Sequence, residues 1–136
     1  MTEVAAPKTA QATGTRRAAP IELVCPAGNL ASLRAAVDNG ADYVYFGLRD
    51  DTNARNFSGL NFGLEEAAAG TRYAHARGAK VLLAINTYPQ STGGTRWLQA
   101  LDTAASLSVD AVILADAGLM EYAARKHPRL RLHLSV

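Results

Sequence analysis

The sequence predicts an α/β protein in which a parallel sheet is covered by helices. Short, nearly continuous apolar runs alternate with segments of helical periodicity, which is the pattern of buried parallel strands and their crossover helices. The alternation starts near residue 21 and gives five strands and four helices in the order β-α-β-α-β-α-β-α-β. With 136 residues, the chain has the length of one ordinary domain.

One apolar run and the turn residues that follow it predict the first strand and the start of the first helix. The run IELVC, residues 21–25, predicts a strand, and PAGN follows it as a turn. Leu30, Leu33 and Val37 then fall on one helical face, and the helix is expected to end at Gly40. Asn29 stands where the N-cap of this helix belongs.

The later elements follow the same logic. DYVYFGL is a strand by its aromatic and β-branched content, and a helix closed by Gly78 follows a long loop. KVLLAIN and DAVILA are apolar strands, Trp97 and Leu101 align on the helix between them, and Pro128 ends the last helix. The expected strands are 42–48, 80–86, 110–115 and 131–136, and the expected helices are 64–77, 95–107 and 117–127.

Two architectures fit this order, an open doubly wound sheet and a (β/α)-barrel, and no local pattern separates them. A last strand without a following helix would leave one edge and one face of the sheet uncovered. A complete barrel has eight such units and about 250 residues. We therefore expect the amino-terminal half of a TIM-like (β/α)8 barrel in a truncated chain, with residues 21–136 as one partial barrel domain.

Composition places the protein among soluble globular proteins, with 49% hydrophobic and 19% charged residues. Residues 1–20 are rich in Ala, Thr and Pro and are expected to be a disordered tail. This tail carries a net charge of +2, which equals the net charge of the whole chain, so the remainder is neutral and predicts no basic nucleic-acid surface. No apolar run approaches the roughly 20 residues of a membrane span, and no secretory signal is recognisable, so we expect a cytoplasmic protein.

Ligands bind at the carboxyl ends of the strands in either architecture, which selects candidate binding residues. Four of the candidates also have a purely structural explanation. Asn29 and Asp116 could serve only as helix caps, Asn86 could simply end its strand, and His133 could be a hydrogen-bonded core residue. The candidates are Asn29 after the first strand, Arg49, Asn53, Arg55 and Asn56 after the second, Asn86 after the third, Asp116 after the fourth, and His133 and Ser135 on the fifth.

The segment RDDTNARNFSGLNFG, residues 49–63, is the most informative of these strand ends. Its fifteen residues exceed the roughly 2–6 of an ordinary strand-to-helix link. Phe57 and Phe62 could pin it over the barrel mouth, while Arg49 or Arg55 could present a planar fork to a carboxylate or phosphate. The alternative is an Ω-loop held by its own Arg–Asp pairs.

Several kinds of site are absent from the sequence. It contains no GxGxxG motif after a strand, no phosphate-binding lysine loop, no paired-histidine metal motif and no GxSxG elbow. Its single cysteine, Cys25, is expected to be a buried small hydrophobe, and one thiol cannot hold an iron–sulfur cluster. The residues predict an anion site and no catalytic or metal-binding residue.

Three segments resemble the collagenase-like peptidase family, whose catalytic type was never assigned. ELVCPAGNLASLRAAVDNGADYVYFGL is similar to the family's opening, and ARNFSGLNFGLEEAAAGTRYAHARGAKV and AVILADAGLMEYAARKHPRLRLHLSV are similar to its next units. The resemblance covers about residues 21–136. Within the family, GLRDDTNARNFSGLNF, AINTYPQSTGGTRW and LHLSV look most like the UbiU branch.

The resemblance to the UbiU branch implies oxygen-independent hydroxylation in ubiquinone biosynthesis. It implies a UbiV-like partner subunit, prephenate as the hydroxyl donor, a quinone precursor as the acceptor and a 4Fe-4S cluster. The family's cluster cysteines lie downstream of this chain, so the 136 residues alone are expected to be inactive. Sibling branches imply two alternatives, an RNA base hydroxylase and a collagenase-like peptidase, and a further alternative is an inactive half-barrel that serves as a binding or assembly module.

Overall fold

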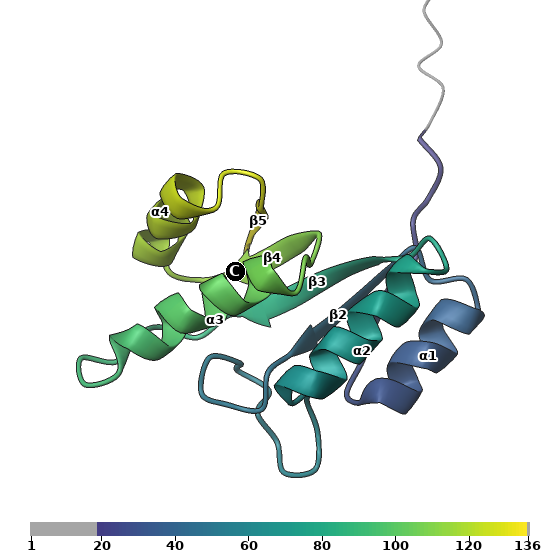
Figure 1. Cartoon of the computed structure of the whole chain (residues 1–136), viewed down its shortest axis with the longest axis horizontal. Coiled ribbons are helices and arrows are strands. Elements are labelled where there is room, and N and C mark those ends of the chain that lie inside the picture. Colours follow the sequence, from purple (N-terminus) through teal and green to yellow (C-terminus); the bar gives the residue numbers. More distant parts are fainter. Residues whose placement is uncertain (1–18, 136) are drawn as a thin grey trace, which may run out of the picture.

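The computed structural model describes residues 19–135 and contains the expected five strands and four helices (Figure 1). The expected disordered tail, residues 1–20, lies outside the described residues except for Ala19 and Pro20. The elements are β1 (Val24–Pro26), α1 (Leu30–Asp38), β2 (Tyr43–Gly47), α2 (Leu64–His75), β3 (Lys80–Ile85), α3 (Gly94–Ser106), β4 (Ala111–Leu114), α4 (Ala117–Lys126) and β5 (Arg131–Leu134).

The strand order decides between the two architectures left open by the sequence. All neighbouring strands are parallel, and the sheet order is β1-β2-β3-β4-β5. A doubly wound sheet reverses its strand order at a switch point, whereas a barrel adds each strand beside the previous one. Right-handed crossovers that always advance in one direction place all helices on the same face. The described chain is therefore a partial α/β barrel.

The two faces of the sheet have different roles. Side chains alternate along each strand, so Val44 and Phe46 of β2 point to the opposite face from Tyr45. Val44 and Phe46 are buried in the core with Leu83 of β3, Val112 of β4 and the inner faces of the helices. The other face is concave, and its hollow of about 430 Å³ is lined by Glu22, Val24, Tyr43, Tyr45, Leu82, Ile113, Arg131 and His133.

The start of β1 differs from the predicted strand 21–25. Ile21 is fully exposed and Leu23 is half exposed, and strand pairing begins only at Val24, which aligns with Tyr43 of β2. The apolar run alone therefore predicted the strand three residues too early. No helix in residues 19–135 is long and apolar enough to cross a membrane.

Candidate binding site at the carboxyl ends of the strands

The segment between β2 and α2, called loop 49–63 below, extends beyond the carboxyl end of β2 (Figure 1). Leu48 and Phe62 form a parallel bridge, so the loop leaves the sheet and returns beside its own starting point. The N–H of Asn61 donates to the carbonyl of Gly28 at 2.7 Å, which ties the loop to the turn after β1. The loop thus covers the carboxyl ends of β1 and β2.

The base of the loop is a buried polar cluster of Thr52, Asn53 and Asn61, each at most 6% exposed. Asn53 Nδ2 donates to Asn61 Oδ1 at 2.8 Å and to the Leu48 carbonyl at 3.4 Å. The side chain of Asn53 also fills the space over Gly47, where an added Cβ would lie 2.2 Å from Asn53 Cγ. Gly47 is therefore required for the loop to pack against the end of β2.

The two phenylalanines of the loop have different environments. Phe62 is 1% exposed and stacks on Phe46 of β2 with ring centroids 4.2 Å apart. The expected pinning role is thus confirmed for Phe62. It is wrong for Phe57, which is 60% exposed, because the intervening turn carries it away from the core.

Arg49 is held by groups at the start of α2. Its Nη2 donates to Glu66 Oε2 and to the Asn61 carbonyl, both at 2.9 Å. Glu66 also accepts from the N–H of Gly63, and this hydrogen bond, together with the charge of Arg49, lowers the pKa of Glu66 from its usual value. Arg49 therefore joins the two ends of the loop to helix α2.

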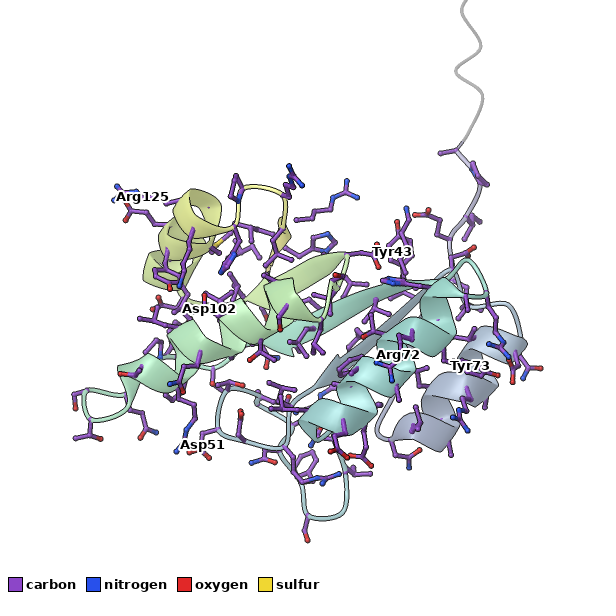
Figure 2. The ribbon with its side chains drawn as sticks, in the orientation of Figure 1. Tyr43, Asp51, Arg72, Tyr73, Asp102 and Arg125 are labelled. Carbon is purple, nitrogen blue, oxygen red and sulfur yellow. The ribbon has the colours of Figure 1, made fainter. Side chains whose placement is uncertain are left out.

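Loop 49–63 is not held by ion pairs between its own arginines and aspartates, as the Ω-loop alternative expected. Asp51 instead pairs with Arg96 of α3 at 2.6 Å, and its carbonyl accepts from Thr87 Oγ1 at 2.5 Å. Figure 2 shows Asp51 on the side of the loop that faces α3. The loop is therefore attached through Asp51 to α3 and to the segment after β3.

Three asparagine side chains hold the main chain around Arg55. Asn86 Oδ1, at the end of β3, accepts from the N–H of Ala54 at 3.0 Å. Asn53 Oδ1 accepts from the N–H of Arg55 at 3.0 Å, and Asn61 Nδ2 donates to the Arg55 carbonyl at 2.7 Å. The Arg55 side chain is exposed, and its guanidinium has no hydrogen bond or ion pair within residues 19–135. The main chain is fixed while the guanidinium stays available.

Arg55 lines a pocket of about 450 Å³ between the loop and the concave face of the sheet. Among its described lining residues Arg55 is the one charged group, since the other polar side chains are three asparagine amides and the Tyr45 hydroxyl. Phe57 and Leu60 contribute apolar surface from the loop. The full lining is Pro26, Ala27, Gly28, Tyr45, Phe46, Gly47, Asn53, Arg55, Phe57, Leu60, Asn61, Ala84, Asn86 and Ile113.

The structure thus brings Asn53, Arg55 and Asn86 together and places Arg49 outside the pocket. Asn56 is exposed near the turn and is not part of the pocket lining.

Three of the remaining candidates have hydrogen-bond partners, whereas the His133 side chain has none within residues 19–135, so the satisfied core position expected for it is not seen. Asn29 caps α1, accepting from the Ser32 N–H at 2.8 Å, and Asp116 caps α4, accepting from the Leu119 N–H at 2.8 Å. These are the capping roles that the sequence allows for both residues. His133 lies half-buried on the concave face, and the Ser135 N–H donates to the Leu114 carbonyl.

Sequence reasoning did not select Tyr45, Leu60 or Asn61 as site residues. The alternation along β2 indicates that Tyr45 faces opposite to Val44 and Phe46, which was a usable signal. Asn61 has a φ of 74°, a left-handed conformation that asparagine tolerates better than most residues, but its partner on Arg55 is a tertiary contact. No sequence pattern shows that contact.

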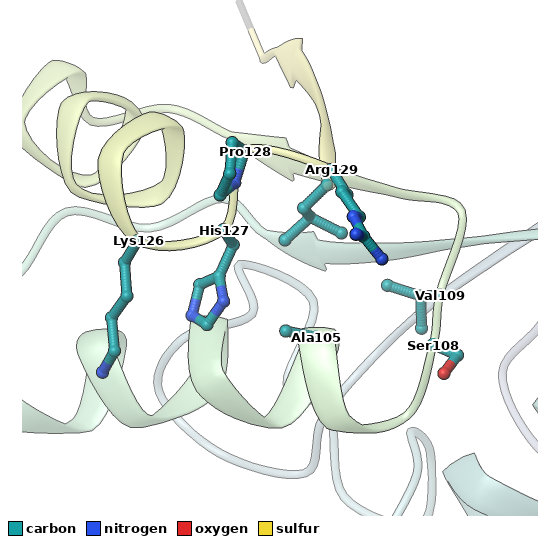
Figure 3. A pocket seen from close by; sticks show the side chains of 8 residues that line it. Ala105, Ser108, Val109, Lys126, His127, Pro128 and Arg129 are labelled. Atoms are coloured by element: carbon teal, nitrogen blue, oxygen red, sulfur yellow. The ribbon is translucent and has the colours of Figure 1, made fainter.

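A second hollow of about 490 Å³ lies at the other end of the sheet, between the carboxyl ends of α3 and α4 (Figure 3). Lys126 Nζ and His127 Nε2 each lie 2.8 Å from a carboxylate oxygen of Asp102, and the hydrogen bond from Lys126, followed by that of His127, lowers the pKa of Asp102. The amino-terminal end of barrel strands generally serves stability. We therefore take the pocket under loop 49–63 as the candidate site.

The described residues do not fit an iron–sulfur cluster. Cys25 is half-buried and packs against the helix-covered core, and no three His, Cys, Asp or Glu side chains gather within residues 19–135 in a way that could hold a metal ion. A cluster generally needs four cysteine thiolates.

Fold and site together define a partial α/β barrel with a pocket at the carboxyl ends of its strands. The chain belongs to peptidase family U32, whose family model matches residues 28–136. This confirms the resemblance to the collagenase-like peptidase family.

Three relatives illustrate the family's range of names. The chain is 40% identical over 119 residues to an uncharacterized protease of Methanocaldococcus jannaschii, covering 85% of this chain and 28% of the relative. It is 38% identical over 115 residues to tRNA hydroxylation protein P of Helicobacter pylori, covering 85% and 27%. It is 30% identical over 115 residues to the 23S rRNA 5-hydroxycytidine synthase of Escherichia coli, covering 85% and 17%. The chain spans about a quarter of the length of the first two.

Solved structures show the same fold. A U32 peptidase superposes with a TM-score of 0.67 at 18% identity, covering 94% of this chain and 54% of that structure. The barrel protein phosphoribosylanthranilate isomerase of Thermotoga maritima superposes with a TM-score of 0.55 at 20% identity, covering 85% and 53%. In each case the chain matches about half of a larger structure, as expected for a partial barrel.

Proposed function

We propose that this chain forms the amino-terminal barrel half of an oxygen-independent hydroxylase and that the pocket under loop 49–63 binds its anionic hydroxyl donor. The observation that carries the proposal is Arg55, a guanidinium without an ion-pair partner in residues 19–135, which lines a pocket whose described lining contains no acidic side chain. Relatives named for hydroxylation of transfer and ribosomal RNA support a hydroxylase-type role in the family.

The acceptor we favour is a quinone precursor, as in the UbiU branch. The segment that resembles this branch most, GLRDDTNARNFSGLNF, is the segment that forms the pocket rim and carries Arg55. Prephenate would then be the donor, with a carboxylate on Arg55, and a UbiV-like subunit would be the partner. A pocket of about 450 Å³ has the size of a small-molecule site.

A 4Fe-4S cluster belongs to this proposal only through cysteines outside the chain. Such a cluster would supply electron-transfer chemistry, and the described residues would contribute ligand binding beside it.

An RNA base is the second candidate acceptor, and the names of the relatives favour it. The neutral charge of residues 21–136 weighs against a broad RNA surface on this half, because RNA binding generally requires several cations along the backbone. A peptidase role has less support, since the pocket lining contains no serine or cysteine nucleophile paired with a histidine base.

The test is deletion of the encoding gene and growth without oxygen. We expect loss of ubiquinone under anaerobic conditions, with aerobic ubiquinone unchanged, measured by mass spectrometry of lipid extracts. Transfer and ribosomal RNA from the same cells are digested and analysed for hydroxylated bases. Loss of an RNA hydroxylation with normal ubiquinone would replace the quinone precursor by an RNA base, and no change in either would refute the hydroxylase proposal.

A further inference from the structure

The tip of loop 49–63 is a fixed turn with two apolar side chains directed to the pocket. The Leu60 N–H donates to the Phe57 carbonyl at 3.1 Å, and Gly59 has a φ of 78°. These are the features of a four-residue β-turn with glycine at its third position. Phe57 and Leu60 therefore stand at the two ends of one turn, and both line the pocket.

Both side chains leave apolar surface uncovered, with Phe57 60% and Leu60 40% exposed. Phe62, five residues from Phe57, shows that this loop can bury an aromatic ring completely. Single exposed apolar residues are ordinary, but here two of them adjoin the one charged side chain of the described pocket lining. Exposed apolar groups beside an available guanidinium match a ligand with both an apolar and an anionic part.

The charge and polarity of the pocket lining indicate which anionic group the ligand carries. A single guanidinium balances one negative charge, and its planar fork matches a carboxylate in bidentate geometry. The remaining polar groups are the neutral Tyr45 hydroxyl and three neutral amides, and the amides of Asn53, Asn61 and Asn86 are already hydrogen-bonded to one another or to main-chain groups around Arg55. A phosphate or nucleic-acid backbone would require further cations, which the described lining does not contain.

We propose that the turn Phe57–Leu60 and Arg55 form a two-part clamp for a ring-bearing carboxylate, with one carboxylate on Arg55 and the ring against Phe57 and Leu60. The inference rests on the proposed function only in taking this pocket as the ligand site. It assigns Phe57 and Leu60 as the residues that select for the ligand's ring. It also explains why the tip carries large apolar side chains that contribute nothing to the core.

The test is titration of the full chain with benzoate, acetate and inorganic phosphate, in which binding is measured by chemical-shift changes in NMR spectra. We expect benzoate to bind at least about tenfold more tightly than acetate or phosphate, since a buried ring adds hydrophobic free energy that acetate lacks. Phe57→Ala should weaken benzoate about fivefold to tenfold and leave acetate unchanged, whereas Arg55→Gln should weaken both carboxylates.

Two matched variants control for general effects. Tyr88→Ala removes an aromatic ring that is 68% exposed and outside the pocket lining, and Arg72→Gln removes an exposed guanidinium on α2 (Figure 2). Equal effects of Phe57→Ala and Tyr88→Ala, or phosphate binding as tight as benzoate binding, would overturn the clamp. This outcome is independent of the deletion experiment, because it measures binding and requires no hydroxylase activity.

Discussion

Arg49 and Arg55 belong to the same loop, six residues apart, and their guanidinium groups have different environments. The Arg49 guanidinium donates hydrogen bonds to Glu66 and to the Asn61 carbonyl and so joins the loop to α2. Arg55 has its main chain held by three asparagines, while its guanidinium has no ion pair in residues 19–135. The difference shows that two arginines of one loop cannot be told apart by residue type, and that the available hydrogen-bonding capacity of Arg55 is what supports its proposed binding role.

The two phenylalanines repeat this contrast and give the largest expected effect on stability. Phe62→Ala should lower the free energy of unfolding by about 3–5 kcal/mol, because it removes a fully buried ring stacked on Phe46. Phe57→Ala should change it by less than about 0.5 kcal/mol. Urea denaturation of both variants checks the pair, and similar losses for the two would mean that the tip is also part of the core.

Gly47→Ala tests whether the base of the loop is rigid. The added Cβ would lie 2.2 Å from Asn53 Cγ, so we expect a loss of about 1–3 kcal/mol in the free energy of unfolding. Gly94→Ala is the control, because nothing lies within 4 Å of its added Cβ. If both variants unfold at the same urea concentration, Asn53 can move aside and the base is not rigid.

Asn86→Ala should have a smaller effect, about 1 kcal/mol, because it removes the acceptor of the Ala54 N–H. Asn56→Ala, at an exposed position close in sequence to the loop tip, should be neutral. Thermal unfolding measures the difference in stability. Benzoate affinity should fall with Asn86→Ala, as expected for a residue that positions Arg55, and an unchanged affinity would contradict that positioning role.

The smallest expected effect is the pH dependence of the stability contributed by the Arg49–Glu66 ion pair. The pKa of Glu66 is lowered from 4.5 by the Gly63 N–H and by Arg49, so its carboxylate stabilises the fold above about pH 4.5. This contribution should be lost as the pH falls through the lowered pKa. The stability difference between wild type and Glu66→Gln, measured by urea denaturation from pH 7 to pH 3, should therefore shrink below about pH 4.5. A constant difference would contradict the proposed interaction.

Much of the fold follows from the sequence, because strand and helix periodicity is local. The alternation of elements and the caps at Asn29 and Asp116 were predictable in this way, whereas the different burial of Phe57 and Phe62 was not. The start of β1 was not, since it depends on which residue pairs with Tyr43.

The site was predictable only to the level of the loop. Its length, arginines and asparagines indicated an anion site at the end of β2. The separate roles of Arg49 and Arg55 depend on Glu66 and Asn86, which are far from them in sequence and are brought close by the packing of α2 and β3. A single sequence contains no signal for such contacts.

The most direct test of the account compares Arg55→Gln with Arg49→Gln in stability and in benzoate affinity. We predict that Arg55→Gln keeps wild-type stability and loses roughly 10-fold to 100-fold in affinity, because a charge-assisted hydrogen bond to the ligand is removed. Arg49→Gln should keep the affinity and lose up to about 1 kcal/mol of stability, as expected for an exposed ion pair. The opposite pattern, or loss of affinity in both variants alike, would contradict the assignment of Arg55 as the binding residue.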